Sequence, residues 1–402
     1  MAGSDADERL RTYARLVIEA GVSLAEGQRL LVHGEIGAAP LAEAIAEAAY
    51  RAGAGYVDVL YSDPRVRRAM VDIGPDEAIG ATPPWMVQRL QDALDAGAAV
   101  ASIAGASHAA LYDGLDPGRL SRARFPELDQ LWLAAINGAR VPWTIVAYPT
   151  EAWATEVFGE PDVERLWAAV GHALRFDADD PVAAWRARAD GLVERARELT
   201  ERSFDALRYR GPGTELEVGL IGGARWMAAR QETDSGQPHI PNLPTEEVFT
   251  CPDRARAEGT IRSTKPLALR GGLIEGLELS FRDGVIVEVR AERGAELVET
   301  ELASDDGARR LGELALVDTS SRVADTGIVF QNTLFDENAA SHIAWGAGFD
   351  WTIEGLGEDA SESLNRSRVH TDFMVGGPEV EIDAVEPGGA VVPLLYGGEW
   401  RL

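Results

Sequence analysis

The stretch RLLVHGEIGAAPLAEAIAEAAYRAGAGYVDVLY, residues 29–61, decides the fold of the first half of the chain. It opens with a short apolar run, residues 29–33, that ends at a glycine and is typical of a buried strand. Residues 38–53 are rich in alanine and place apolar side chains at helical spacing, and residues 56–61 form a second apolar run. The order strand, helix, strand predicts two parallel strands joined by a crossover helix.

The same alternation continues through the first half of the sequence. Residues 98–103 and 143–148 are further short apolar runs, and a proline closes the second of them. Strands that alternate with helices favour a parallel sheet with helices on both faces. The sequence therefore predicts an α/β N-terminal domain with a mostly parallel sheet.

The pattern changes near residue 205. Two alternating runs, residues 277–281 and 285–289, flank the turn Arg282-Asp283-Gly284 and predict a β-hairpin. We expect a β-rich α+β C-terminal domain, and we place the domains at residues 1–204 and 205–402. A helix rich in arginine and glutamate, residues 181–202, would link them.

Charge and composition exclude several classes of protein. The 402 residues include 66 acidic and 38 basic side chains, for a formal charge of −28. Binding to nucleic acid requires a cationic surface, so it is disfavoured. The N-terminus lacks a signal-peptide pattern, no stretch is apolar enough to span a membrane, and Cys251 is the single cysteine. We expect a soluble cytoplasmic protein with neither nucleic acid nor membrane as a partner.

Common nucleotide and nucleophile motifs are missing from the sequence. The segment after the first predicted strand, residues 34–39, lacks the glycine spacing of a dinucleotide-binding turn. No phosphate-loop lysine motif and no Gly-x-Ser-x-Gly motif occurs. The α/β domain is therefore interpreted as a scaffold.

Two of the six histidines lie in segments dense with polar side chains. His342 follows the segment 332–338, and His370 stands two residues before Asp372. Side chains two residues apart share one face of a strand, so this pair can approach one ion, although a surface pair explains the spacing equally well. Asp336 and Glu337 either belong to such a site or cap a helix that carries His342.

Two glutamates strengthen the case for a metal site. Glu313 lies inside the apolar run 311–317, where an ionised carboxylate is rare unless it is paired or bound to a metal. Glu247 lies where turn residues give way to an apolar strand. Its neighbour Glu246 is expected to face solvent, because adjacent side chains on a strand point in opposite directions.

These segments resemble the thermophilic-type metallo-aminopeptidases, the family of aminopeptidases T, S and II. The similarity runs in order through most of the chain. It is carried by both glutamate segments, by His342, and by residues 27–31, 143–146, 211–214, 225–227, 333–338 and 370–374.

The resemblance implies a set of metal ligands for two divalent ions, and carboxylate and imidazole ligands suit zinc, cobalt or manganese. The ligand positions fall on Glu247, Glu313, His342, His370 and Asp372, with Glu313 a candidate bridge between the ions. It further implies a catalytic C-terminal domain and a homodimer. The general base is Glu313, Glu337 or the metal-bound hydroxide.

One position departs from the family pattern. The family usually carries a tyrosine seven residues after the first ligand histidine, and this sequence has Phe349 there. A phenylalanine has no hydroxyl to donate to an oxyanion, which could lower turnover by roughly a hundredfold to a thousandfold. Lys265 lies in a segment similar to one in the family and either pairs with an acid of the site or is solvated.

The function that follows is metal-dependent removal of the N-terminal residue from a short peptide or amide with a free N-terminus. Two bound ions would activate a water and polarise the scissile carbonyl. A ring-cleaving dioxygenase with one ferrous ion is an alternative, because two histidines and a carboxylate can hold it. A metal-binding homologue with reduced or altered activity is another, and Phe349 favours it.

Overall fold

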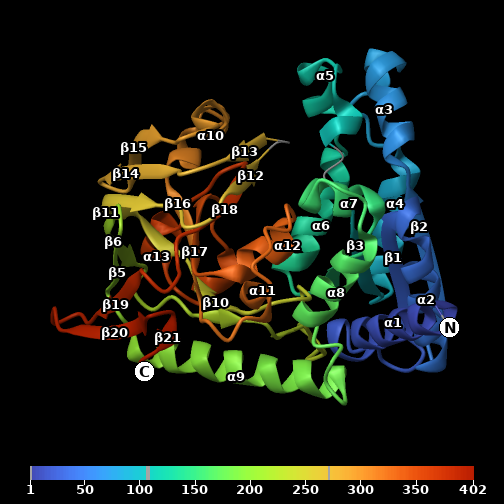
Figure 1. Cartoon of the computed structure of the whole chain (residues 1–402), viewed down its shortest axis with the longest axis horizontal. Helices are drawn as coiled ribbons and strands as arrows, with labels where there is room; N and C mark the ends of the chain where they lie inside the picture. The colour runs from blue at the N-terminus through green and yellow to red at the C-terminus, as the bar shows by residue number, and fades with distance from the viewer. Residues whose placement is uncertain (1, 106–108, 270–271) are drawn as a thin grey trace. The chain divides into compact units, whose positions relative to one another are not determined.

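The computed structural model describes residues 2–105, 109–269 and 272–402. The chain divides into two compact units, one made of residues 1–187 with 230–243 and the other of residues 188–229 with 244–402 (Figure 1). This division falls inside helix α9, Pro181–Arg202. The predicted boundary after residue 204 stays a prediction about independently folding domains.

A parallel sheet forms the centre of the first unit, as the sequence predicts. Its strand order is β2-β1-β3-β4, and every neighbouring pair runs parallel. The strands are β1, Arg29–Glu35; β2, Tyr56–Ser62; β3, Ala99–Ala104; and β4, Trp143–Ala147. Helix α2, Ala39–Arg51, is the crossover between β1 and β2, and its side chains Leu41, Ala42, Ile45 and Ala49 are buried.

Helix α1 anchors its end of this unit through one tyrosine. In α1, Ala2–Leu16, the fully buried Tyr13 donates its hydroxyl to the carbonyl of Ala147 at 2.8 Å. The same oxygen accepts the backbone N–H of Ala147 at 3.1 Å. Both polar functions of the buried phenol are therefore satisfied at the end of β4.

The second unit is rich in antiparallel strands, and the predicted α+β class is confirmed. Its larger sheet has the order β15-β14-β11-β6-β5-β19-β20-β21. These strands are β5, Ala206–Gly211; β6, Thr214–Leu220; β11, Pro252–Arg262; β14, Glu278–Arg282; β15, Val285–Arg290; β19, Glu381–Val385; β20, Val391–Tyr396; and β21, Glu399–Trp400. Strands β14 and β15 form the predicted hairpin, with positive φ at Asp283 and Gly284, as a tight two-residue turn requires.

A five-stranded sheet of the second unit has the order β18-β17-β16-β10-β7. Its strands are β7, Met227–Ala228; β10, Glu247–Thr250; β16, Leu311–Val317; β17, His342–Gly346; and β18, His370–Met374. All four pairings between neighbours are antiparallel. This sheet carries all of the predicted metal ligands.

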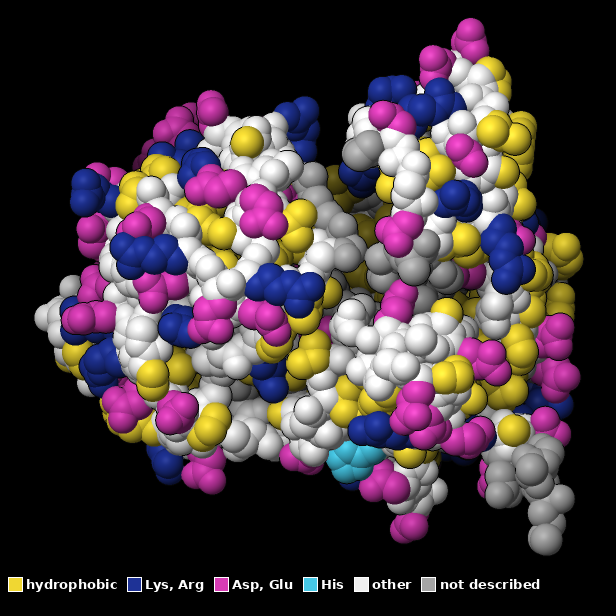
Figure 2. Space-filling model, turned by 45° about the horizontal axis from the view of Figure 1, so that its top comes forward, with side chains coloured by type: hydrophobic (Ala, Val, Ile, Leu, Met, Phe, Trp, Pro, Cys, Tyr) yellow, Lys and Arg dark blue, Asp and Glu magenta, His cyan; other side chains and the backbone are white. Residues whose placement is uncertain are grey.

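Acidic and basic side chains lie interspersed on the face shown in Figure 2. That face therefore offers no extended cationic surface to a phosphate backbone. Among the described helices, none is both long and apolar enough to cross a membrane.

Candidate metal centre

The five predicted ligands come from four adjacent strands of the five-stranded sheet. Glu247 begins β10, Glu313 lies in β16, His342 begins β17, and His370 and Asp372 lie in β18. They are separated by up to about 125 residues in the sequence. Only the pairing of these strands brings them together.

The strand register places all five side chains on one face of the sheet. Residues that pair directly across antiparallel strands point to the same side. Glu313 pairs with Ala344, and Ala344 pairs with Asp372. Alternation along each strand then adds three more pairs to this face: Ala315 with His342, Val317 with Glu247, and Gly346 with His370.

Small side chains form the floor between the ligands. Ala315 and Ala344 are fully buried and lie on the same face as the five acids and imidazoles. Because alanine ends at Cβ, the space above these two positions is left to the longer side chains around them. The opposite face of the sheet carries Leu314, Ile343, Trp345 and Phe373, which are fully buried.

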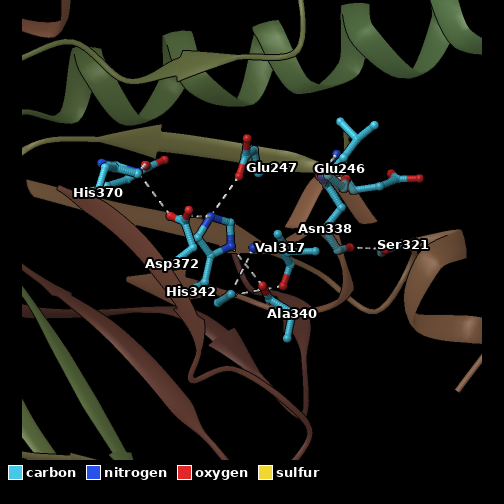
Figure 3. A network of polar contacts seen from close by, with 12 residues as sticks. Glu246, Glu247, Val317, Ser321, Asn338, Ala340, His342, His370 and Asp372 are labelled. Carbon is cyan, nitrogen blue, oxygen red and sulfur yellow. Dashed lines mark hydrogen bonds and ion pairs between the residues drawn. The ribbon is translucent and has the colours of Figure 1, made fainter. Parts of the chain in front are cut away.

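The donor atoms form two groups that share Glu313. Glu247, Glu313 and His342 make up the first, and Glu313, His370 and Asp372 the second, with the donor atoms of each group within 4.8 Å of one another. Figure 3 shows His342 and Asp372 pointing toward Glu247 and His370. His342 Nε2 lies 3.0 Å from Glu247 Oε2, and His370 Nε2 lies 3.0 Å from Glu313 Oε2.

Backbone carbonyls orient both imidazoles. The Nδ1 of His342 is 3.2 Å from the carbonyl of Ala340, and the Nδ1 of His370 is 2.7 Å from the carbonyl of Ala347. A carbonyl can only accept, so Nδ1 carries the proton in both rings. Each Nε2 therefore faces the carboxylates with its lone pair available to a cation.

The buried carboxylates of the site favour positive charge beside them. Burial lowers the pKa of His342, but the hydrogen bond and charge of Glu247 outweigh this effect and raise it to about 10. Burial raises the pKa of Glu313, and the hydrogen bond from His370 opposes the rise. The carboxylates thus favour positive charge at both imidazoles, and a divalent ion bound at each Nε2 would supply that charge in place of a proton.

The residues fit divalent ions. Carboxylate oxygens and imidazole nitrogens are the ligands that zinc, cobalt and manganese take in proteins. Asp372 Oδ1 is buried and has no hydrogen-bond partner among the described residues, although His370 Nε2 lies 3.3 Å away. A metal ion would supply the missing partner of this oxygen.

The expectation for Glu246 was wrong. Its side chain is fully buried and accepts a hydrogen bond from Arg188 Nε at 2.6 Å. Its backbone N–H donates to Asn338 Oδ1 at 2.6 Å (Figure 3). The side chain of Glu246 does point away from the ligand face. It is still not exposed to solvent, because Arg188 of helix α9 covers it.

The alternative of a helix carrying His342 was wrong too, since His342 begins strand β17. Asp336 nevertheless has a structural role: it accepts the backbone N–H groups of Phe330 at 2.7 Å and Asn332 at 3.0 Å and closes that loop. Glu337 is different, because its carboxyl lies within the field of the ligands. Burial, followed by the charges of Glu247 and Asp372, raises its pKa well above the usual range.

Phe349 lies beside the second donor group. Its ring centroid is 5.1 Å from that of His370, and it stacks on Trp351 at 4.9 Å with an interplanar angle of 6°. Phe249 contacts it edge-on at 5.7 Å. The position at which the family usually has a tyrosine therefore belongs to an aromatic cluster in contact with the candidate metal centre.

An antiparallel sheet that presents two carboxylate–imidazole groups around a shared glutamate suits a metal-dependent hydrolase. The family model of the thermophilic metalloproteases (M29) matches residues 6–400. The chain belongs to this family, as its motifs predict.

Relatives match the chain over nearly its whole length. Aminopeptidase T of Thermus aquaticus is 42% identical, with 98% of each chain covered, and aminopeptidase 2 of Geobacillus stearothermophilus is 38% identical over the same shares. The structure of wild-type AmpT from Thermus thermophilus superposes with a TM-score of 0.92 at 40% identity, covering 98% of this chain and 99% of that one. The predicted enzyme class, a metallo-aminopeptidase, is confirmed.

Proposed function

We propose that this enzyme removes the N-terminal residue from short peptides with a free amino terminus, using a water activated by two divalent ions. The observation that carries the proposal is the pair of donor groups that share Glu313. One such group could hold a single ion, whereas two groups with a common carboxylate suit a bridged pair.

The proposed ligands are Glu247, Glu313 and His342 for one ion and Glu313, His370 and Asp372 for the other. When bound, zinc, cobalt or manganese ions would lower the pKa of a water and polarise the scissile carbonyl. The carbonyls of Ala340 and Ala347 keep both imidazoles aimed at these positions.

Proton transfer is assigned to Glu337. Glu313 takes part in both donor groups, so its oxygens would be occupied by the ions. Glu337 belongs to neither group, yet its carboxyl lies within the field of Glu247, Asp372 and Glu313. With the ions bound, their positive charge would offset the carboxylates that raise the pKa of Glu337, and its carboxylate could then take a proton from the attacking water and return it to the leaving amine.

The names of the relatives support peptides as substrates, since those proteins are aminopeptidases. The ferrous dioxygenase is not favoured, because one ion would leave one of the two donor groups unused. The homodimer remains a prediction that light scattering in solution can test.

The decisive experiment combines metal counting with peptide hydrolysis. The protein is stripped with a chelator, reloaded with zinc, cobalt, manganese or ferrous ion, and assayed on short peptides while bound metal is quantified. We expect about two ions per chain and cleavage with a non-iron metal. Glu313→Gln should abolish cleavage, whereas Glu362→Gln on the exposed helix α13, Glu358–Ser363, should leave it intact. Full loading without cleavage of any peptide would reject the proposal.

A further inference from the structure

Lysine is used once in this chain. Of the 38 basic residues, Lys265 is the only lysine, and all others are arginines. Arginine is a planar fork of donors, whereas lysine presents a compact charge on a flexible stem. A single lysine among so many arginines directs attention to what surrounds its ammonium group.

Lys265 lies on the connection between β11 and β12, Leu267–Leu269. The preceding residue fixes this connection to the end of β18. The backbone N–H of Thr264 donates to the carbonyl of Met374 at 2.8 Å, and its hydroxyl donates to the carbonyl of Gly376 at 2.6 Å. The base of the lysine side chain is thus held against the sheet that carries the candidate metal centre.

The lysine lines a cavity of about 320 Å³ within the second unit. Other parts of its wall are Val317, Asp318, Ala340 and Gly376. Alanine and glycine dominate the wall near the sheet, so backbone surrounds much of the space. A cavity of this size can take a residue-sized group.

The cavity adjoins the first donor group. Val317 pairs with Glu247 and lies on the ligand face, and the carbonyl of Ala340 accepts from Nδ1 of His342. Val317 is two residues beyond Ala315, the alanine of the floor, which corresponds to roughly 7 Å along a strand. The cavity therefore begins about one or two peptide residues away from the candidate metal centre.

The ammonium group of Lys265 makes no hydrogen bond or ion pair with any described residue. Two acids share the wall with Lys265: Asp318 accepts from the backbone N–H of Ser320 and lies 3.6 Å from Arg188 Nη2, and Glu379 is exposed to solvent. Asp336, whose carboxyl senses the charge of Lys265, already holds two backbone N–H groups. One cation in the wall of the cavity is left to pair with a ligand.

We propose that Lys265 binds a carboxylate of the substrate in this cavity while the N-terminal residue lies at the metal centre. The proposal rests on the proposed function. The carboxylate is either the C-terminus of a very short peptide or an acidic side chain that follows the N-terminal residue. Lys265 is thereby a specificity-determining residue that favours substrates with negative charge close to the scissile bond.

The test compares three substrates that share an N-terminal leucine: leucyl-alanine, leucyl-alanine amide and leucyl-glutamate amide. The metal-loaded enzyme should cleave one of the two charged peptides with a kcat/KM about tenfold higher than that of leucyl-alanine amide, mainly through KM. Preference for leucyl-alanine identifies the C-terminus, and preference for leucyl-glutamate amide identifies the side chain.

Lys265→Met should abolish this preference, and Lys265→Arg should fail to restore it fully because the guanidinium is larger and planar. Arg282→Met, which removes one positive charge from an exposed position of the same unit, should keep the preference. Equal hydrolysis of all three peptides by the wild-type enzyme, or an unchanged preference in Lys265→Met, would overturn the inference and leave the proposed function intact.

A second experiment measures binding at Lys265 and does not require peptide hydrolysis. Because Lys265 is the only lysine, an amine-reactive reagent can modify only this side chain and the N-terminal amine. N-acetyl-leucyl-alanine and N-acetyl-leucyl-glutamate amide carry the two candidate carboxylates, and N-acetyl-leucyl-alanine amide carries none. One of the first two should slow modification of Lys265 severalfold, as measured by mass spectrometry. Protection by neither would reject carboxylate binding even if the enzyme cleaved no peptide at all.

Discussion

At the scale of single residues, Phe349 stands where the resemblance predicts a tyrosine. Its ring stacks on Trp351 and contacts His370, so a hydroxyl at its para position would be added to an aromatic ring that already borders the second donor group. We expect Phe349→Tyr to increase kcat by roughly tenfold to a hundredfold, because a phenol can donate to the developing oxyanion.

Steady-state kinetics of the metal-loaded variant check this expectation. Phe249→Tyr is the matched control, since it adds a hydroxyl to the neighbouring ring of the same cluster. An equal gain in both variants would show that the position of the hydroxyl is irrelevant, and no gain at Phe349 would mean that the missing donor does not limit turnover.

The ion pair of Arg188 and Glu246 gives a second prediction at this scale. Glu246 is fully buried, so removal of its partner in Arg188→Met should lower the free energy of unfolding by about 3–5 kcal/mol. Because Glu246 precedes the proposed ligand Glu247, metal affinity should fall as well. Urea titration and metal binding measure the two effects, and Arg197→Met on the exposed side of the same helix should change neither beyond about 0.5 kcal/mol.

Individual residues also show how far sequence reasoning reaches into the candidate site. An acid inside an apolar run singles out Glu313, because burial of an unpaired charge is too costly to occur without a partner. The other four positions required the resemblance to a family, since spacing alone leaves a surface pair as good an explanation for His370 and Asp372. The role of Glu246 was missed because alternation tells which way a side chain points and not what covers it.

At the scale of elements, the floor of the candidate metal centre depends on two alanines in neighbouring strands. Ala344 lies between Glu313 and Asp372 in the strand register. In Ala344→Leu the added methyl groups would enter the space above the floor, and we expect loss of metal binding with a destabilisation of about 1–3 kcal/mol. Metal content after dialysis measures the loss, and Ile343→Leu on the opposite face of β17 should retain full metal content.

The sequence predicted elements well where local pattern and tertiary environment agree. The crossover unit of residues 29–61 and the hairpin of residues 277–289 follow from periodicity and turn residues. The strand β17 was harder, because its short run from His342 to Gly346 is buried along its whole length and shows no alternation. Its neighbours in the sheet, remote in sequence, determine its conformation.

At the scale of the whole molecule, one buried histidine of the first unit gives a pH dependence. Burial lowers the pKa of His239 to about 4, below the value near 6.5 in an unfolded chain. Between pH 6.5 and pH 4 the unfolded state therefore binds more protons than the folded state. The contribution of His239 to the free energy of unfolding is present above pH 6.5 and is lost as the pH falls toward 4.

The expected loss is about 3 kcal/mol for the unit that contains His239. Calorimetric unfolding of metal-free wild-type protein and His239→Gln, carried out from pH 7 to pH 4, compares the two. The stability difference should shift in favour of the variant as the pH falls. A difference that stays constant across this range would contradict the depressed pKa.

The order of the ligands along the chain has a consequence for biosynthesis. Glu247 leaves the ribosome first and Asp372 last, about 125 residues later, and the edge strand β18 supplies two of the five donors. At roughly 5–20 residues per second, translation of this interval takes about 6–25 s. During that time a nascent chain has no complete centre and cannot attack other peptides. Peptidase activity would therefore arise only after Asp372 has been synthesised.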